Sequence, residues 1–300
     1  MSRLFSAYVV VDWSSASKPA AGPESIAIAV LKRDVRFRLA FEGFACATRA
    51  EAEARLGLIF DDLKKRGEKA LLGLPFPLGL PRGFSGLMKL TGEPWSANLD
   101  LLNKMAKDKP DNVNNRFGVG AEINRRLTGG PFPFWGCPPR DALTTLQPKR
   151  GREHGEGDPP EFRYADLAHA PAKGGPTPIW KLYYAGQVGG LTILGLPMLK
   201  RLRKTRALKL WPFETGWKTL APADLDGVDV VAAEIRLGQH KSQPTTMGGR
   251  DLTEVRGLAE HFAKLDETGK LAAAFAAPKT ATPEEVEAVE GEEGWVLTGQ

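Results

Sequence analysis

The sequence predicts a mixed α/β fold, and three observations in its first quarter support that prediction. An apolar, β-branched run ends in Asp12 and is followed at once by small hydroxyl residues, which is typical of a buried strand and its exit. Two further apolar or alternating segments predict the next strands, over 25–31 and 36–41. A helical pattern over 47–67 then precedes a short apolar strand over 69–74, and a crossover helix implies that the strands it joins are parallel.

The segment 47–67 carries explicit helix signals. Thr48 with Glu51 three residues later matches a capping box, and Gly67 stands where a helix commonly stops. Apolar residues recur at helical spacing between these ends, at Leu56, Ile59, Phe60 and Leu63. The strand that follows is closed by Pro75, because proline cannot continue a central strand.

The segment 82–206 differs in composition from the rest of the chain. It is rich in Gly, Pro, Trp and Asn, and its best helix candidates are short, over 95–107 and 119–127. We therefore expect a single domain over 1–300 with an insertion subdomain over about 82–206. Regular structure resumes after it, with expected strands over 207–213 and 228–235 and an amphipathic helix over 251–275.

Length and composition are typical of a soluble globular protein. The 300 residues are 42% hydrophobic and 26% charged, and no apolar stretch approaches the roughly 20 residues that span a bilayer. The N-terminus has no signal-peptide pattern, and Cys46 and Cys137 stand far apart without metal-binding spacing. We therefore expect reduced thiols, a cytoplasmic location and no membrane partner. The sequence does not indicate an oligomeric state.

The net charge of +5 and the isoelectric point near 9.1 favour an anionic partner, such as nucleic acid or a nucleotide-like phosphorylated ligand. Much of the positive charge is concentrated over 149–152 and 200–206. Such clusters are either phosphate-binding stripes or solvated faces of the protein. The sequence leaves both interpretations open.

Three carboxylates at the ends of predicted elements form the candidate catalytic and metal-binding set: Asp12, Glu234 and Asp251. Mg²⁺ and Mn²⁺ prefer oxygen ligands, and a two-metal centre needs several carboxylates that converge from different elements. Asp12 and Glu234 end predicted strands, and Asp251 starts a predicted helix. The alternative is structural, with Asp251 as a helix N-cap and Glu234 as a surface residue just beyond its strand.

A second set of residues is suited to substrate binding. Asn114, Asn115 and Arg116 combine amides with a guanidinium that can bind a phosphate or a base, whereas their structural alternative is an Asn-rich turn with an arginine ion pair. Trp135 lies in an aromatic loop fixed by prolines, which serves either as a stacking platform or as a hydrophobic plug. Glu214 ends another predicted strand and either joins the acidic site or binds a nearby loop.

Several motifs recur in the same order in one family: Val-Val-Asp12-Trp-Ser-Ser, Asn114-Asn115-Arg116-Phe117, Pro133-Phe-Trp135-Gly136, Phe162-Arg163, Trp180-Lys-Leu, Gly186-Gln-Val-Gly189, Trp211-Pro-Phe-Glu214 and Glu293-Gly-Trp295. Over nearly its whole length the chain resembles the bacterial DUF429-like group of predicted ribonuclease-H-like nucleases. Some members are labelled molybdopterin-guanine dinucleotide synthesis proteins. The resemblance implies a ribonuclease-H-like mixed sheet with flanking helices and a long Gly/Pro/Trp-rich insertion.

One departure concerns the metal site that this resemblance implies. Related sequences usually read Gly-Phe-Asp-Phe-Pro-Phe-Gly where this chain reads Gly-Leu-Pro-Phe-Pro-Leu-Gly over 73–79, so Pro75 replaces an aspartate of the fourth strand. The leading hypothesis is a divalent-metal-dependent phosphodiesterase or nuclease-like hydrolase in which Asp12, Glu234 and Asp251 hold Mg²⁺ or Mn²⁺. Pro75 motivates a second hypothesis, a protein without turnover that binds a nucleotide or a pterin-type cofactor, linked to molybdopterin-guanine dinucleotide synthesis.

Overall fold

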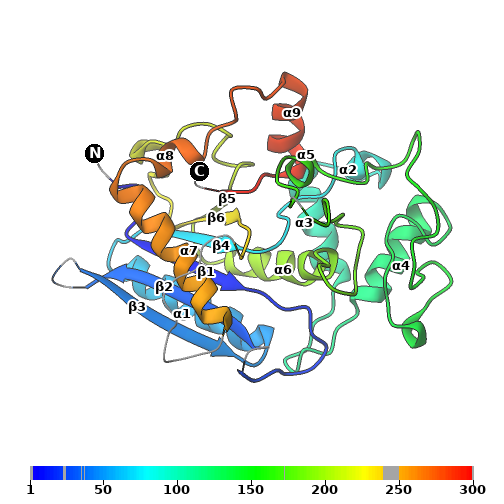
Figure 1. Cartoon of the computed structure of the whole chain (residues 1–300), viewed down its shortest axis with the longest axis horizontal. Coiled ribbons are helices and arrows are strands. Elements are labelled where there is room, and N and C mark those ends of the chain that lie inside the picture. The colour runs from blue at the N-terminus through cyan, green and yellow to red at the C-terminus, as the bar shows by residue number, and fades with distance from the viewer. Residues whose placement is uncertain are drawn as a thin grey trace.

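A single mixed sheet of six strands organises the computed structural model of this chain (Figure 1). The structure describes residues 3–22, 25–34, 36, 38–171, 173–238 and 250–298. Within them the strands are β1 (Ala7–Asp12), β2 (Ile26–Arg33), β3 (Leu39–Cys46), β4 (Ala70–Leu74), β5 (Leu208–Leu210) and β6 (Val230–Glu234). Their order across the sheet is β3-β2-β1-β4-β6-β5. β1, β2 and β3 pair antiparallel, whereas β1–β4, β4–β6 and β6–β5 are parallel. The predicted mixed α/β class is confirmed.

The helices of the described residues are distributed over the whole chain. The α-helices are α1 (Arg49–Lys65), α2 (Phe84–Leu87), α3 (Pro94–Met105), α4 (Arg116–Leu127), α5 (Tyr164–Ala168), α6 (Gly189–Leu202), α7 (Arg250–Glu267), α8 (Leu271–Ala274) and α9 (Pro283–Ala288). Two short 3-10 turns, η2 (Pro139–Asp141) and η3 (Pro222–Leu225), and one π-helical turn, η4 (Val289–Glu293), complete the set.

The sheet separates two apolar cores, because alternate residues of a strand project to opposite faces. Val9 and Leu72 belong to the core that contains α1 and α6, whereas Val10 and Leu71 belong to the core that contains α7. In the view of Figure 1, α7 crosses in front of the sheet and α1 lies behind it. The four strand side chains are at most 1% exposed, so both faces of the central strands are covered.

α1 begins and ends close to its sequence signals. The Thr48 side chain accepts a hydrogen bond from the amide of Glu51 at 3.2 Å, and the Glu51 carboxylate accepts one from the amide of Ala47 at 2.8 Å. Gly67 follows the helix with a φ of 66°, a left-handed conformation that glycine adopts without strain. The predicted helix is confirmed. It could be predicted because its start and its end depend on contacts between residues close together in the chain.

Three elements differ in extent from their predictions. The strand expected over 36–41 is β3, which starts later and runs further because it pairs along the whole of β2. The strand expected over 207–213 is only β5, since Pro212 has no amide hydrogen for a sheet ladder. The helix expected over 251–275 is divided into α7 and α8 at Gly269, where φ is 72°.

The segment 82–206 contains α2 to α6 and long irregular loops, and Figure 1 shows much of it to one side of the sheet. Its side chains nevertheless share an apolar core with β1 and β4. Phe134 and Trp180 are both buried in that core, at no more than 1% exposure. The segment therefore packs directly on the sheet that carries the candidate site.

Both cysteines are free thiols in the structure. Cys46 and Cys137 are buried, and burial raises the pKa of both thiols. Among the described residues, no helix combines the length and the apolar character needed to cross a membrane.

Candidate functional site

A cavity of about 830 Å³ opens at the edge of the sheet where β1, β4 and β6 end. Open α/β sheets commonly bind their ligands at this carboxyl edge, and the volume falls in the usual range for small-molecule sites. Its polar lining consists of Asp12, Asp166, His169, Thr177, Glu234 and Arg236. Its apolar lining includes Pro75, Pro77, Val188, Leu191, Ile235 and Leu237. This edge cavity is the candidate functional site.

The register of the sheet places Asp12 beside Pro75. Val10 is paired with Gly73 and Gly73 with Ala233, so the three parallel strands end at nearly the same level. Asp12 and Pro75 each lie two residues beyond the paired Val10 and Gly73, and both line the edge cavity. Neighbouring strands are about 4.8 Å apart, so side chains at these two positions can approach one ligand or ion.

Glu234 is held in an ion pair with Arg163. The two Nη atoms of Arg163 donate to the two carboxylate oxygens of Glu234 at 2.7 and 2.8 Å. Asp166 accepts two further bonds from the same guanidinium, at 2.8 and 3.2 Å. Although burial opposes the charge of Arg163, the carboxylates of Asp166 and Glu234 raise its pKa well above the usual value. Glu234 is only 4% exposed, and both its oxygens are bound by a cation of the protein itself.

The three candidate metal ligands are therefore placed differently. Asp12 and Glu234 both line the edge cavity, but Glu234 is bound to Arg163. Asp251 is the second residue of α7, and its side chain lies outside the described residues. Within the described part of the chain, no three His, Cys, Asp or Glu side chains are grouped to hold a metal ion. Because Glu234 and Asp166 are paired with Arg163 and Pro75 supplies no side-chain oxygen, the described side chains do not fit a pair of Mg²⁺ or Mn²⁺ ions.

Asn114 and Arg116 support the loop that follows Asp12. Nη1 of Arg116 donates to Oγ of Ser17 at 2.8 Å and to Oδ1 of Asn114 at 2.9 Å. Asn114 donates in turn to the carbonyl oxygen of Asn112 at 2.8 Å. The Asn-rich turn proposed as the structural alternative is present, but Arg116 forms no ion pair with a described carboxylate.

Asn115 supports the end of α3, whereas Arg49 supports the loop that follows Asp12. The Asn115 side chain accepts from the amide of Lys107 at 2.7 Å and donates to the carbonyl of Met105 at 3.0 Å, which closes the end of α3. Arg49 donates to two carbonyl oxygens of the loop 13–17, at 3.1 and 2.8 Å. The loop beyond Asp12 is thus held by the guanidinium groups of Arg49 and Arg116.

Trp135 lies in a loop whose aromatic neighbours are buried. Its amide donates to the carbonyl of Trp180 at 3.0 Å, and Phe132 and Phe134 are at most 3% exposed. The ammonium of Lys181 lies 5.8 Å from the centre of the Trp135 ring. Most of this loop serves as a hydrophobic plug, and Trp135 does not line the edge cavity.

The basic segment 200–206 is largely neutralised by ion pairs. Arg203 donates to both oxygens of Glu214 at 2.7 and 2.8 Å, so Glu214 binds this segment rather than the edge cavity. The other pairs are Lys200–Asp100 at 2.6 Å, Arg201–Glu53 at 2.6 Å and Arg206–Asp61 at 2.8 Å. Arg150 and Arg152 are likewise paired, with Glu161 and Asp158. These clusters fit the interpretation as solvated faces.

Two residues of the edge cavity carried no clear signal in the sequence. Burial, together with the charges of Arg236 and Arg163, lowers the pKa of His169 to about 4, so its imidazole is neutral at neutral pH. Its Nε2 has no hydrogen-bond partner among the described groups, and its ring packs edge-on against Trp295 at 5.1 Å. Arg236 lines the cavity and forms no ion pair with any described residue. Only its position two residues after Glu234, at a strand end, hinted at Arg236.

The proline loop that borders the cavity is fixed by η4. The amide of Leu80 donates to the carbonyl of Glu292 at 3.1 Å. A Cβ atom at Gly79 would lie 2.1 Å from that same oxygen, so only glycine fits there. The Glu293 carboxylate accepts from the amide of Arg82 at 2.9 Å. These contacts tie the loop to the C-terminal part of the chain.

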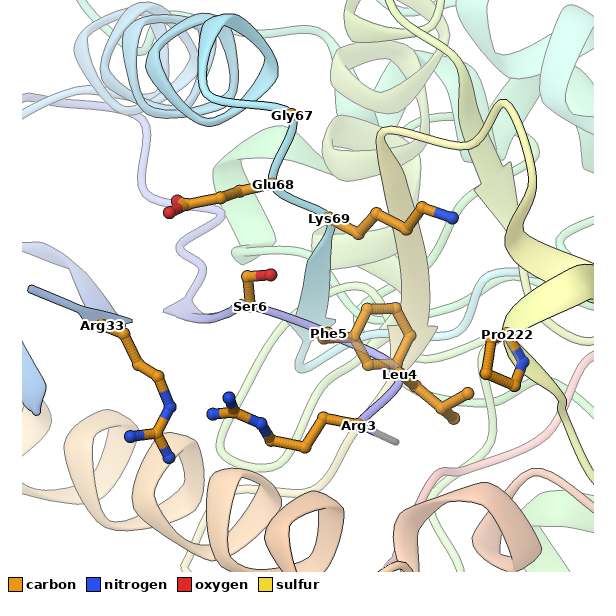
Figure 2. Close-up of a pocket in the computed structure, with 9 residues that line it drawn as sticks. All are labelled: Arg3, Leu4, Phe5, Ser6, Arg33, Gly67, Glu68, Lys69 and Pro222. Atoms are coloured by element: carbon orange, nitrogen blue, oxygen red, sulfur yellow. The ribbon is translucent and has the colours of Figure 1, made fainter. Parts of the chain in front are cut away.

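A second cavity, of about 390 Å³, lies at the opposite edge, where β1 and β4 begin (Figure 2). Figure 2 shows the guanidinium groups of Arg3 and Arg33 pointing toward one another in it. Arg33 is ion-paired with Glu267, and Lys69 donates to the carbonyl of Leu225 at 2.6 Å. Arg33 and Lys69 are thus already bound by other groups of the protein, which makes this second cavity the weaker candidate for a ligand site.

Comparisons with known proteins identify no relative: no family model, no curated protein and no solved structure matches this chain.

Proposed function

We propose that the edge cavity binds a small phosphorylated ligand of the nucleotide or pterin type. The observation that carries the proposal is Arg236, a guanidinium that lines a cavity of about 830 Å³ and has no ion-pair partner among the described residues. A planar guanidinium matches the oxygens of a phosphate with two parallel hydrogen bonds. An unpaired cation in a cavity of this size favours an anionic group on the ligand.

The rest of the cavity suits the ring of such a ligand. Leu191, Leu237 and Pro75 provide apolar surface for the faces of a planar ring. The carboxylate of Asp12 can accept hydrogen bonds from ring N–H groups, such as the amino group that guanine presents. Arg163 offsets charge on Glu234, which reduces repulsion of a bound phosphate. A ligand with N–H donors at one end and a phosphate at the other therefore complements the lining.

We further infer a ribonuclease-H-like sheet with an insertion over 82–206. Three antiparallel strands, a crossover helix and a parallel β4 beside β1 support this inference. The free, buried Cys46 and Cys137 are compatible with the cytoplasmic location that we include in the proposal.

The second candidate function is divalent-metal-dependent hydrolysis of a phosphodiester. It is favoured by Asp12, a carboxylate at the end of the central strand β1 that faces the cavity. The other described carboxylates of the cavity, Glu234 and Asp166, are bound by Arg163. Calorimetry with Mn²⁺ tests this candidate: binding that disappears in Asp12→Asn supports it.

The main proposal is tested by titrating the protein with GMP, guanosine and inorganic phosphate in a calorimeter. We expect GMP to bind more tightly than either fragment, because phosphate and ring contact different walls. Arg236→Gln should weaken GMP binding by about tenfold or more, since a charge-assisted hydrogen bond contributes roughly 1.5–3 kcal/mol. Arg140→Gln is the matched control, because the Arg140 side chain is 87% exposed and does not line the cavity. Equal affinities of the Arg236→Gln variant and the unmodified protein would overturn the proposal.

A further inference from the structure

Arg116 is a buried cation that forms no ion pair with a carboxylate of the described residues. It is 5% exposed, and among the described residues its Nε has no hydrogen-bond partner and its Nη1 donates to the neutral groups of Ser17 and Asn114. Burial and the neighbouring charge of Arg49 lower its pKa to about 10, so Arg116 stays protonated at neutral pH. Buried charges are normally paired, but no described carboxylate forms an ion pair with this one, and Asp141 and Asp108 only partly offset its charge from a greater distance.

An aromatic patch extends from Arg116 to the surface. The guanidinium carbon of Arg116 lies 4.2 Å from the centre of the Phe117 ring, and Phe117 lies 6.1 Å edge-on from Tyr183. Tyr183 and Tyr184 follow, with ring centres 4.8 Å apart. Their exposed fractions are 37% and 46%, which are large for adjacent aromatic side chains. We call these four residues the Arg116 patch.

The backbone of the patch is strained at Tyr184. Its φ is 71°, a left-handed conformation that a bulky residue adopts only when its surroundings impose it. The Tyr184 hydroxyl donates to the carbonyl of Cys137 at 3.3 Å, and Lys181 donates to the carbonyl of Ala185 at 2.6 Å. These contacts hold the strained turn and keep the Tyr184 ring at the surface.

The N-terminus of α6 adds to the positive potential at this place. A Cβ atom at Gly190 would lie 3.3 Å from Cδ of Arg116, so the first turn of this 14-residue helix lies against the arginine. The helix dipole places partial positive charge at that end. The amide of Gly190 donates to Oε1 of Gln187 at 2.9 Å, so the helix contributes through its dipole, which together with Arg116 favours an anion.

We propose that the Arg116 patch is a second binding site, for a nucleoside monophosphate unit whose base stacks on Tyr183 and Tyr184 and whose phosphate pairs with Arg116. Stacking on aromatic side chains accepts any base, because every base has a π-face. Gly186 and Val188, just beyond Tyr184 in the chain, line the edge cavity. The two sites are thus linked by a short stretch of chain, and a ligand with two nucleotide units that occupies both is an extension that rests on the proposed function. A short ligand fits better than a long nucleic acid, because the basic segment 200–206 is largely ion-paired.

The test is fluorine NMR of protein labelled with 3-fluorotyrosine and titrated with AMP, adenosine or ribose 5-phosphate. The chain has four tyrosines, so Tyr183→Phe and Tyr184→Phe assign the two signals of the patch. We expect AMP to shift both signals and the two fragments to require concentrations at least tenfold higher. Tyr184→Ala should raise the AMP concentration needed to shift the Tyr183 signal about tenfold, because one stacking surface is lost. Leu58→Ala, which truncates a side chain that is 64% exposed on α1, should leave it unchanged.

Arg116→Gln should abolish the AMP-dependent shifts while the circular dichroism spectrum stays native. Unmoved Tyr183 and Tyr184 signals at saturating AMP would overturn the inference, and so would shifts that survive unchanged in both Arg116→Gln and Tyr184→Ala. Arg236→Gln separates the two sites. If the proposal for the edge cavity alone is wrong, the patch signals still respond to AMP, with the same affinity in Arg236→Gln as in the unmodified protein.

Discussion

Two buried arginines, Arg163 and Arg116, are surrounded by opposite kinds of neighbour. Arg163 is 0% exposed and holds the carboxylates of Glu234 and Asp166. Among the described residues, Arg116, which is 5% exposed, contacts neutral groups, an aromatic ring and the start of α6, and it forms no ion pair. A buried charge with its counter-charges stabilises the fold only as long as the set is complete, whereas one without them leaves room for a ligand anion. Equal burial thus has different consequences, which stability and binding measurements can separate.

The largest effect is expected for Arg163→Met. This substitution leaves two buried carboxylates without their cation, and breaking a buried pair in this way typically costs about 3–5 kcal/mol of unfolding free energy. Urea denaturation at neutral pH measures the loss. Arg140→Met, at a side chain that is 87% exposed, should change stability by no more than about 0.5 kcal/mol. A loss below about 1 kcal/mol for Arg163→Met would mean that Glu234 and Asp166 are solvated or protonated, contrary to the ion pair.

The pH dependence of the unfolding free energy should reveal the protonation of His169, which is buried near the charge of Arg163. Its folded-state pKa is lowered to about 4 by burial and by Arg236 and Arg163, whereas the unfolded value is near 6.5. Above pH 6.5 both states hold the neutral imidazole. As the pH falls from 6.5 to 4, only the unfolded state takes up the proton, so stability decreases by on the order of 2 kcal/mol. Below pH 4 this contribution levels off.

His169→Gln removes this titration. Urea denaturation of both proteins at pH 7.0 and pH 4.5 should show a smaller difference between the two pH values in the variant. If the two proteins lose equal stability over this interval, the imidazole is not buried in neutral form as described.

A smaller effect is expected from Pro75→Asp, which adds a carboxylate beside Asp12 where Glu234 is already bound by Arg163. Mn²⁺ affinity should rise by up to about tenfold, because strands about 4.8 Å apart let the two carboxylates share an ion. Pro75→Ala is the matched control, since it removes the proline without adding charge. Calorimetry with Mn²⁺ and hydrolysis of a generic phosphodiester provide the measurements. Equal Mn²⁺ affinity of Pro75→Asp and Pro75→Ala would place Pro75 outside any metal site.

The smallest change in stability is expected for Arg116→Met. The substitution loses hydrogen bonds to Ser17 and Asn114 but also removes an unpaired buried charge, so unfolding free energy should change by no more than about 1 kcal/mol. Urea denaturation at neutral pH checks this directly against Arg163→Met. A loss near 3 kcal/mol would show that Arg116 supports the fold as Arg163 does, and the contrast between the two would disappear.

Local signals in the sequence were sufficient for much of the fold. α1 could be predicted from its capping box and its terminal glycine because these residues contact one another within one turn. The end of β5 was misjudged at Pro212, where a local proline rule outweighed the apolar pattern. The division between α7 and α8 at Gly269 was missed, since an isolated glycine in a helical pattern does not always end the helix.

The candidate site was recognised only in part. Asp12 at the end of β1 was visible from its strand, and Arg116 from the residues around it. His169 and Arg236 cannot be recognised from the sequence, because burial and distance to other charges cannot be read from neighbours in the chain. Glu234 was seen as a carboxylate at a strand end, but its partner Arg163 lies 71 residues away.

The sequence by itself determined the α/β class, the capped helix α1 and the carboxylate that ends β1, because these depend on periodicity and on contacts within a few residues. Only the tertiary structure decided which charges are paired. The cationic segment 200–206 pairs with Glu53 on α1, Asp100 on α3 and Glu214, and Glu234 pairs with Arg163, whereas Arg116 forms no ion pair among the described residues. The physical reason is that the energy of a charge depends on its distance to other charges and on its exposure to water, and folding sets both.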